Sequence, residues 1–168
     1  MELLDITVYY LEMRARPGRR IPPPRDQLSV EYIASPSIAY WRAFYNAVGE
    51  PYRWLSRRKM SDDQLSAIIH DERVEMHVLK VQGQDAGFAE LDRRQFGEIE
   101  LVQFGLLPEF VGQSLGKWFL QQVVEIAWGY EPQRFWLHTC SLDHQAALPN
   151  YLKAGFILFK QELIRREY

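Results

Sequence analysis

The feature that most constrains this chain is a stretch in which a strand is followed by a short loop and then by a long amphipathic helix. The strand is predicted over residues 98–107 and the helix over residues 115–128. Gly112 lies in the loop between them, and Gly116 lies in the first turn of the helix. Free backbone N–H groups at a helix start attract anions, and a glycine-containing approach lets a phosphate come close. The stretch predicts a binding site for a diphosphate group. A tight strand-to-helix turn without a ligand is the alternative.

Two other glycine motifs are excluded at this position. Gly116-Lys117 is followed by Trp118 where a Walker A loop needs Ser or Thr, and the upstream glycine is misplaced. The dinucleotide fingerprint G-x-G-x-x-G is absent. The loop therefore belongs to neither of these nucleotide-binding classes.

The periodicity of apolar residues predicts an α+β fold. Strands are expected at residues 6–13, 28–33, 74–81, 86–91, 98–107, 134–140 and 156–164, and helices at residues 38–48, from 61 onward, 115–128 and 143–153. This order indicates one mixed, mostly antiparallel sheet with helices on both faces, in which a meander leads into two right-handed β-α-β crossovers. We expect residues 1–168 to form a single domain, with a core over residues 28–164.

The segment before that core is a strand followed by a loop rich in proline and arginine. Three consecutive prolines, Pro22 to Pro24, lack backbone donors and exclude regular structure. Arg14, Arg16, Arg19, Arg20 and Arg25 make this the most basic stretch of the chain. Its simplest interpretation is a solvated loop.

Composition excludes several classes of protein. A net charge of −2 argues against a nucleic-acid binder. The single cysteine, Cys140, rules out a disulfide framework, and the four histidines lack metal-ligand spacing, so no metal is expected. No apolar run is long enough to span a bilayer and the acidic start is unlike a secretory signal, so a cytoplasmic protein without membrane contact is predicted. A thiol nucleophile built from Cys140 and His144 is the weaker alternative, because His138, two residues from Cys140 on the same strand face, is too far away for a direct hydrogen bond.

A second motif lies near the C-terminal end. Tyr151 stands in the last turn of the predicted helix, four residues before Gly155, and Phe156 begins the next strand. Together with the glycine loop and the preceding Leu107-Pro108-Glu109-Phe110, this junction resembles the GNAT superfamily of acyl-CoA-dependent N-acetyltransferases. The resemblance covers about residues 28–164. Two positions depart from the family's pattern. Val111 stands where the family usually has Gln or Arg, and Ser114 stands where it usually has Gly.

The resemblance implies acetyl-CoA as cosubstrate, held in a split between strands 98–107 and 134–140. Pantetheine would pair with the first of these strands, with Gly105 permitting the bulge that opens the split, and Tyr151 would be the general acid. The expected cofactor contacts are Phe104, Leu106, Leu107, Gly112, Gln113, Ser114, Leu115, Gly116, Lys117 and Tyr151.

The remaining roles are less constrained. Glu100 is the expected catalytic base with Glu98 in reserve, and a solvated glutamate pair is the alternative. The acceptor, a primary amine of a small molecule or peptide, is expected to contact Tyr45, Tyr52, Trp54, Arg57, Glu90 and His138, although core aromatics and solvated arginines would give the same pattern. A catalytically silent acyl-CoA sensor is the rival hypothesis, and a homodimer is compatible with both.

Overall fold

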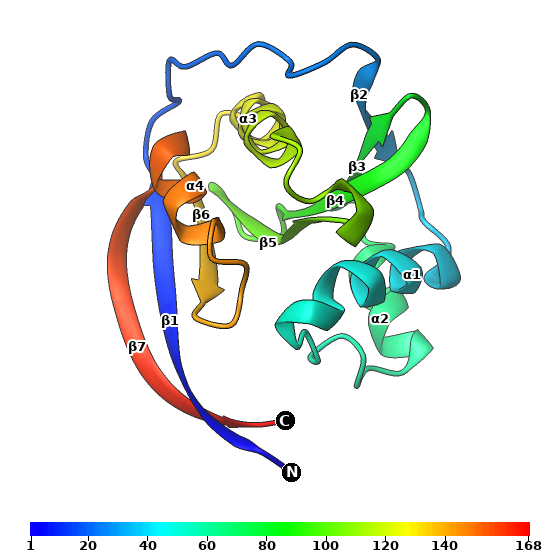
Figure 1. Cartoon of the computed structure of the whole chain (residues 1–168), viewed down its shortest axis with the longest axis vertical. Coiled ribbons are helices and arrows are strands. Elements are labelled where there is room, and N and C mark those ends of the chain that lie inside the picture. Colours follow the sequence, from blue (N-terminus) through cyan, green and yellow to red (C-terminus); the bar gives the residue numbers. More distant parts are fainter.

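The computed structural model describes residues 1–168, and all seven strands join one sheet (Figure 1). The strands are β1 (Leu3–Met13), β2 (Leu28–Ile33), β3 (Val74–Val81), β4 (Gln84–Asp92), β5 (Glu98–Leu106), β6 (Arg134–Cys140) and β7 (Ile157–Glu167). The α-helices are α1 (Ile38–Gly49), α2 (Asp62–Ile69), α3 (Leu115–Trp128) and α4 (Ala147–Ala154), with short 3₁₀ turns η1 (Glu50–Tyr52) and η2 (Pro108–Phe110). The predicted α+β class with a mixed sheet is confirmed.

The first part of the sheet is the predicted antiparallel meander. Strands β2, β3, β4 and β5 pair in that order, and β5 then runs parallel to β6 after the crossover through α3. Gln82 and Gly83 both have positive φ at the β3–β4 turn, which is the backbone conformation that tight hairpins favour.

The second expected crossover, β6-α4-β7, joins two parallel strands that are not neighbours in the sheet. The sheet order is β2-β3-β4-β5-β6-β1-β7, so β1 lies between β6 and β7 and pairs antiparallel with both. The Pro/Arg-rich segment 14–27 therefore crosses from one side of the sheet to β2 at the opposite edge, and Figure 1 shows it passing over α3. Ile6 and Leu11 on β1 have no exposed surface, so β1 belongs to the buried part of the sheet.

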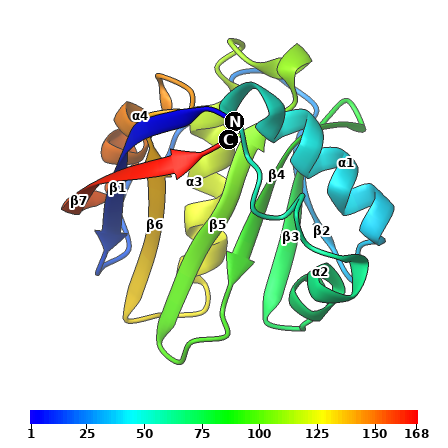
Figure 2. The same ribbon diagram turned by 90° about the horizontal axis from the view of Figure 1, so that it is seen from below.

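Helices cover both faces of the sheet, as predicted (Figure 2). Helices α1 and α2 bury Trp41, Phe44 and Leu65 against one face, while α3 buries Phe119 and Val123 against the other. Local sequence fixes where these helices begin. Ser37 caps α1, and a reciprocal Ser61–Gln64 capping box begins α2.

Strands β5 and β6 separate after three paired positions, Glu98 to Glu100 with Arg134 to Trp136. A register shift in the β4–β5 pairing between Glu90 and Leu91 leaves Val102 as the extra residue on β5. The bulge therefore lies at Val102, and the prediction that it lies at Gly105 is wrong. Gly105 is needed for close packing instead, because a Cβ there would lie 2.4 Å from Val48 Cγ1 on α1.

Helix α4 begins later than the expected residue 143. The Asp143 carboxylate accepts hydrogen bonds from the Thr139 hydroxyl and the Cys140 N–H, which ties residue 143 back to the end of β6. The chain therefore makes a turn before the helix starts at Ala147. None of the helices is both long and apolar enough to cross a membrane.

Candidate functional site

A cavity of about 1230 Å³ opens where β5 and β6 part. Its walls come from β5, the loop before α3, the first turns of α3 and α4, the segment after α1 and the end of β7. Of the predicted site residues, the lining includes Tyr45, Tyr52, Trp54, Arg57, Phe104, Leu106, Gly112, Ser114, Leu115, Gly116, Lys117, His138 and Tyr151. Leu107, Gln113 and the three predicted glutamates are outside it.

The backbone of β5 has free hydrogen-bonding groups facing the split. Leu107 N–H donates to Ala86 O at 2.8 Å, and neighbouring residues of an antiparallel pair alternate between bonding to the partner and facing away from it. Phe104 and Leu106 thus direct their N–H and C=O groups toward β6, which no longer pairs with them. Leu107 also accepts from Phe110 N–H at 2.9 Å. Both backbone groups of Leu107 are therefore bonded within the chain, unlike those of Phe104 and Leu106 that face the split.

The loop before α3 turns sharply through two left-handed residues. Gly112 has φ +82 and Ser114 has φ +63, and open space surrounds the position where a Cβ on Gly112 would lie. Ser114 makes no side-chain cap of α3, so the first N–H groups of the helix keep no such partner. Gln113 is held by its side chain, which donates to Glu109 O at 2.8 Å and accepts from Arg25.

Tyr151 combines burial with an unpaired hydroxyl. Its side chain is 8% exposed, packs edge-on against Phe104 and Phe156, and lines the cavity. No hydrogen bond within the chain uses its hydroxyl. Burial, and secondarily the charge of Asp143, raises the pKa of Tyr151 well above the ordinary value, so the phenol keeps its proton at neutral pH.

Glu100 lies at the floor of the split, in the last pair that joins β5 to β6. Burial raises its pKa to about 7, and the neighbouring Asp92 and Glu90 carboxylates add to the rise. Glu98, two residues earlier, forms an ion pair with Arg134 at 3.1 Å. The two predicted bases thus differ, because Glu100 has no cation bonded to it and Glu98 has one.

A buried ion pair supports one wall of the cavity. Arg57 binds Glu90 through two hydrogen bonds of 2.8 and 3.2 Å, and the two side chains are 9% and 1% exposed. Glu90 therefore orients Arg57 rather than facing an acceptor itself. The backbone N–H of Arg57 also donates a hydrogen bond to the Tyr45 hydroxyl at 3.2 Å. This bond fixes the Tyr45 ring against Trp41 and Trp54.

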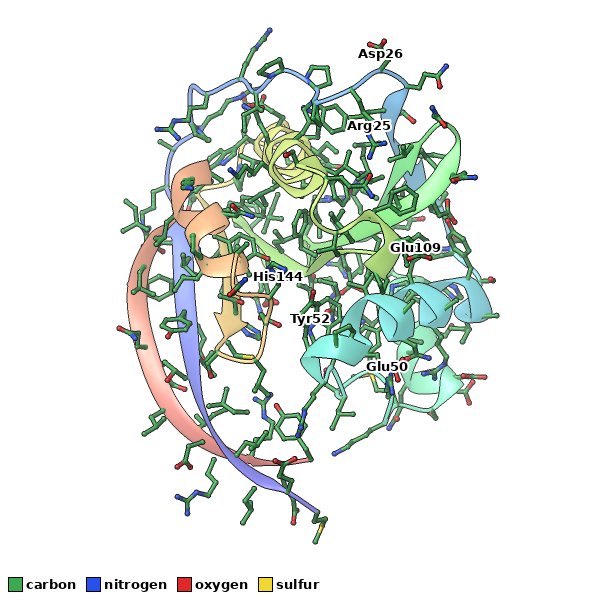
Figure 3. The ribbon with its side chains drawn as sticks, in the orientation of Figure 1. Arg25, Asp26, Glu50, Tyr52, Glu109 and His144 are labelled. Carbon is green, nitrogen blue, oxygen red and sulfur yellow. The ribbon has the colours of Figure 1, made fainter.

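Asp143 joins the two walls, and sequence reasoning gave it no part in the binding site. The Trp54 indole N–H donates to its carboxylate at 3.1 Å, across 89 positions of the chain. Beside this contact, Tyr52 meets the His144 ring edge-on at 6.1 Å (Figure 3). The one available signal was an acidic residue at the start of a predicted helix, which alone does not indicate a partner.

His138 and Cys140 both line the cavity from β6. Desolvation lowers the pKa of His138, although the Asp143 charge opposes this change, so the imidazole is mostly neutral at pH 7. Burial raises the pKa of the Cys140 thiol, with Asp143 adding to the rise. A thiol in this state is a poor nucleophile, which disfavours the cysteine-based alternative.

The end of β7 also lines the cavity, and no sequence signal pointed to it. Ile164 and Arg166 belong to the lining, and both chain ends lie beside the turn after α1 (Figure 2). Arg53 in that turn pairs with Glu2 at 2.6 Å and lies over the Tyr168 ring. The placement of β1 and β7 thus closes one side of the site.

These features can accommodate an extended ligand with an anionic end. Free amide groups of β5 can pair with amides of the ligand as an added strand, and the turn at Gly112–Lys117 can receive a diphosphate. The unpaired Tyr151 hydroxyl lies in the same cavity as both. An acyl-CoA has these groups, with a thioester at the other end.

Comparison with known families finds a match over most of the chain. The model of the "Acetyltransferase (GNAT) family" matches residues 41–156, more than half of the chain. A comparison with curated proteins finds no match.

Solved structures share the fold at low sequence identity. A GCN5-related N-acetyltransferase from Sphaerobacter thermophilus aligns with 96% of this chain at a TM-score of 0.68 and 14% identity, and this chain spans only 51% of that protein. A GNAT family acetyltransferase from Elizabethkingia anophelis with acetyl-CoA bound aligns at 0.61 and 17% identity, covering 81% of this chain and 80% of the other. An IAA acetyltransferase from Bacillus cereus aligns at 0.61 and 21% identity, covering 79% of each.

Proposed function

Because the chain belongs to the GNAT acetyltransferase family, we propose that it is an N-acetyltransferase that moves the acetyl group of acetyl-CoA directly to a primary amine of a small molecule or peptide. The observation that carries the proposal is the split itself. It joins the free backbone of Phe104 and Leu106, the glycine turn before α3 and the Tyr151 hydroxyl in one cavity. No metal has a role in this proposal.

The residues that would hold the donor follow from this arrangement. Backbone groups of Phe104 and the C=O of Leu106 would pair with pantetheine, and the N–H groups from Gly112 to Lys117 would bind the diphosphate. Acetyl-CoA supplies a thioester, whose carbonyl carbon accepts the amine. The Leu106 N–H is the candidate donor for the oxygen on which negative charge develops.

Two side chains would move the protons. Glu100 takes a proton from the incoming ammonium through water, because the carboxylate lies at the floor of the split and outside the cavity lining. As the new C–N bond forms and the C–S bond breaks, Tyr151 gives its phenolic proton to the departing thiolate, and the second proton lost by the amine nitrogen returns to Tyr151 through water. A carboxyl with a pKa of about 7 is suited to act as a base near neutral pH.

The acceptor would lie between the segment after α1 and the end of β7. Tyr52, Trp54 and His138 offer aromatic surface there, while Asp143 provides a carboxylate that can attract a cationic amine. The rival function, a silent acyl-CoA sensor, is supported by Val111 and by the Cβ that Ser114 adds within the anion-binding turn. Catalytic turnover separates the two.

A thiol-release assay with acetyl-CoA is the direct test. We expect free CoA to appear faster with at least one member of a panel of amines, amino acids, polyamines and peptides than without acceptor, and mass spectrometry to identify an acetylated amine. Thermal unfolding should shift upward with CoA. Stabilisation by NAD and not by CoA would contradict the proposal, and CoA binding without turnover on any acceptor would favour the sensor.

The pH dependence of kcat/KM tests the base. Only ionised Glu100 accepts a proton, so activity should fall as the pH drops through about 7, by roughly tenfold per unit well below that value. Glu100→Gln should remove this fall and leave only the titration of the acceptor amine. Glu98→Gln is the matched control on the same strand and should keep the wild-type profile. Identical profiles for Glu100→Gln and wild type would exclude Glu100.

A further inference from the structure

A second, smaller cavity of about 270 Å³ lies between the segment 14–27, α3 and α4. It is lined in part by Arg19, Arg20, Lys117 and Lys153. The cavity adjoins the larger one, because residues of α3 and α4, including Lys117 and Lys153, line both. The basic segment therefore covers a cavity that shares lining residues with the candidate active site.

The covering segment is held in place by specific contacts. Gln121 on α3 accepts from the Ile21 N–H and donates to Arg19 O, so its side chain bonds to the segment's backbone at two points. Arg16 pairs with Glu125 on α3, and Arg19 donates to Lys153 O on α4 at 2.8 Å. The segment is thus fastened across both helices and is not merely a solvated loop.

The charges in this cavity are unbalanced. Glu125 is its only acidic lining residue, and that carboxylate is already paired with Arg16. Arg20, Lys117 and Lys153 have no carboxylate partner. All three side chains are exposed, so they can bind a ligand without first being freed from a buried contact. Unpaired cations around a concave space favour a phosphate group.

We propose that the second cavity binds the adenosine end of the acyl carrier, and that Arg20, Lys117 and Lys153 bind its 3′-phosphate. This inference rests on the proposed function, which places the diphosphate at residues 112–117. Lys117 belongs to that turn and also lines the second cavity, so the nucleotide attached to a diphosphate bound there would lie next to this cavity. The Pro/Arg-rich segment would then be a part of the cofactor site supplied by the N-terminal region.

Calorimetric titration with CoA and with 3′-dephospho-CoA tests the assignment, because the two ligands differ only in the phosphate. We expect wild type to bind CoA about tenfold more tightly than dephospho-CoA. Arg20→Ala and Lys153→Ala should each bring the two dissociation constants closer together while leaving dephospho-CoA binding nearly unchanged. Retained dephospho-CoA binding also shows that each variant is folded.

Arg14→Ala is the matched control. Arg14 belongs to the same segment and loses the same charge, but it pairs with Glu12 and does not line the cavity. Its CoA preference should equal that of wild type. Equal affinities of wild type for the two ligands would overturn the 3′-phosphate site and leave the proposed function standing. The same drop in preference for all three variants would show a diffuse charge effect and also overturn it. Failure of wild type to bind either ligand would overturn both proposals.

Discussion

Replacing Tyr151 with phenylalanine is expected to lower kcat for thiol release by roughly 100-fold or more, with little change in the dissociation constant for CoA. The variant removes the only group in the cavity that we assign to protonate the departing thiolate. It keeps the ring that packs against Phe104 and Phe156. Because the hydroxyl has no partner within the chain, stability should also be preserved. Single-turnover thiol release and calorimetry measure the two quantities.

Tyr40→Phe provides the control for this substitution. The Tyr40 hydroxyl donates to Asp85 at 2.9 Å and lies outside the cavity, so its removal should cost stability by about 1 kcal/mol and leave kcat unchanged. If Tyr151→Phe and Tyr40→Phe turn over at the same rate as wild type, Tyr151 is not the acid. An acyl-CoA sensor would give no turnover in any of the three proteins.

Replacing Glu90 with alanine is expected to lower the free energy of unfolding by about 3–5 kcal/mol. The substitution leaves the Arg57 guanidinium without its carboxylate partner in a place where water reaches it poorly. The midpoint of thermal unfolding should fall by roughly 10 °C or more. Urea denaturation measures the free energy, and acetyl transfer should also decline because Arg57 and Tyr45 lose their fixed positions.

Two comparisons make this prediction specific to burial. Asp5→Ala breaks an exposed pair with Arg165, which water and salt screen, so it should cost far less stability than Glu90→Ala. The double variant Glu90→Met with Arg57→Met should recover much of the loss, since an apolar pair removes both buried charges. A Glu90→Ala protein as stable as Asp5→Ala would mean that the ion pair does not support the wall.

Much of the fold was predictable because local sequence decides it. The meander β2–β5, the capping box at Ser61 and Gln64 and the separation of β5 from β6 all followed from periodicity, turn chemistry and family resemblance. The position of β1 in the sheet could not be predicted, because the sequence of an apolar strand does not specify which strand it pairs with. Placing it between β6 and β7 depends on contacts between residues more than 120 positions apart.

The candidate site divides in the same way. The glycine turn, Tyr151 and the likeness to an acyl-CoA site are continuous motifs, so the sequence alone determined them. Pairings between distant residues were decided only by the tertiary structure: Glu90 with Arg57, Trp54 with Asp143, and the basic segment 14–27 with α3 and α4. A residue type states what a side chain can bond to. Which partner it meets depends on how the whole chain packs, and burial then decides the charge that the side chain carries, as the raised pKa of Glu100 illustrates.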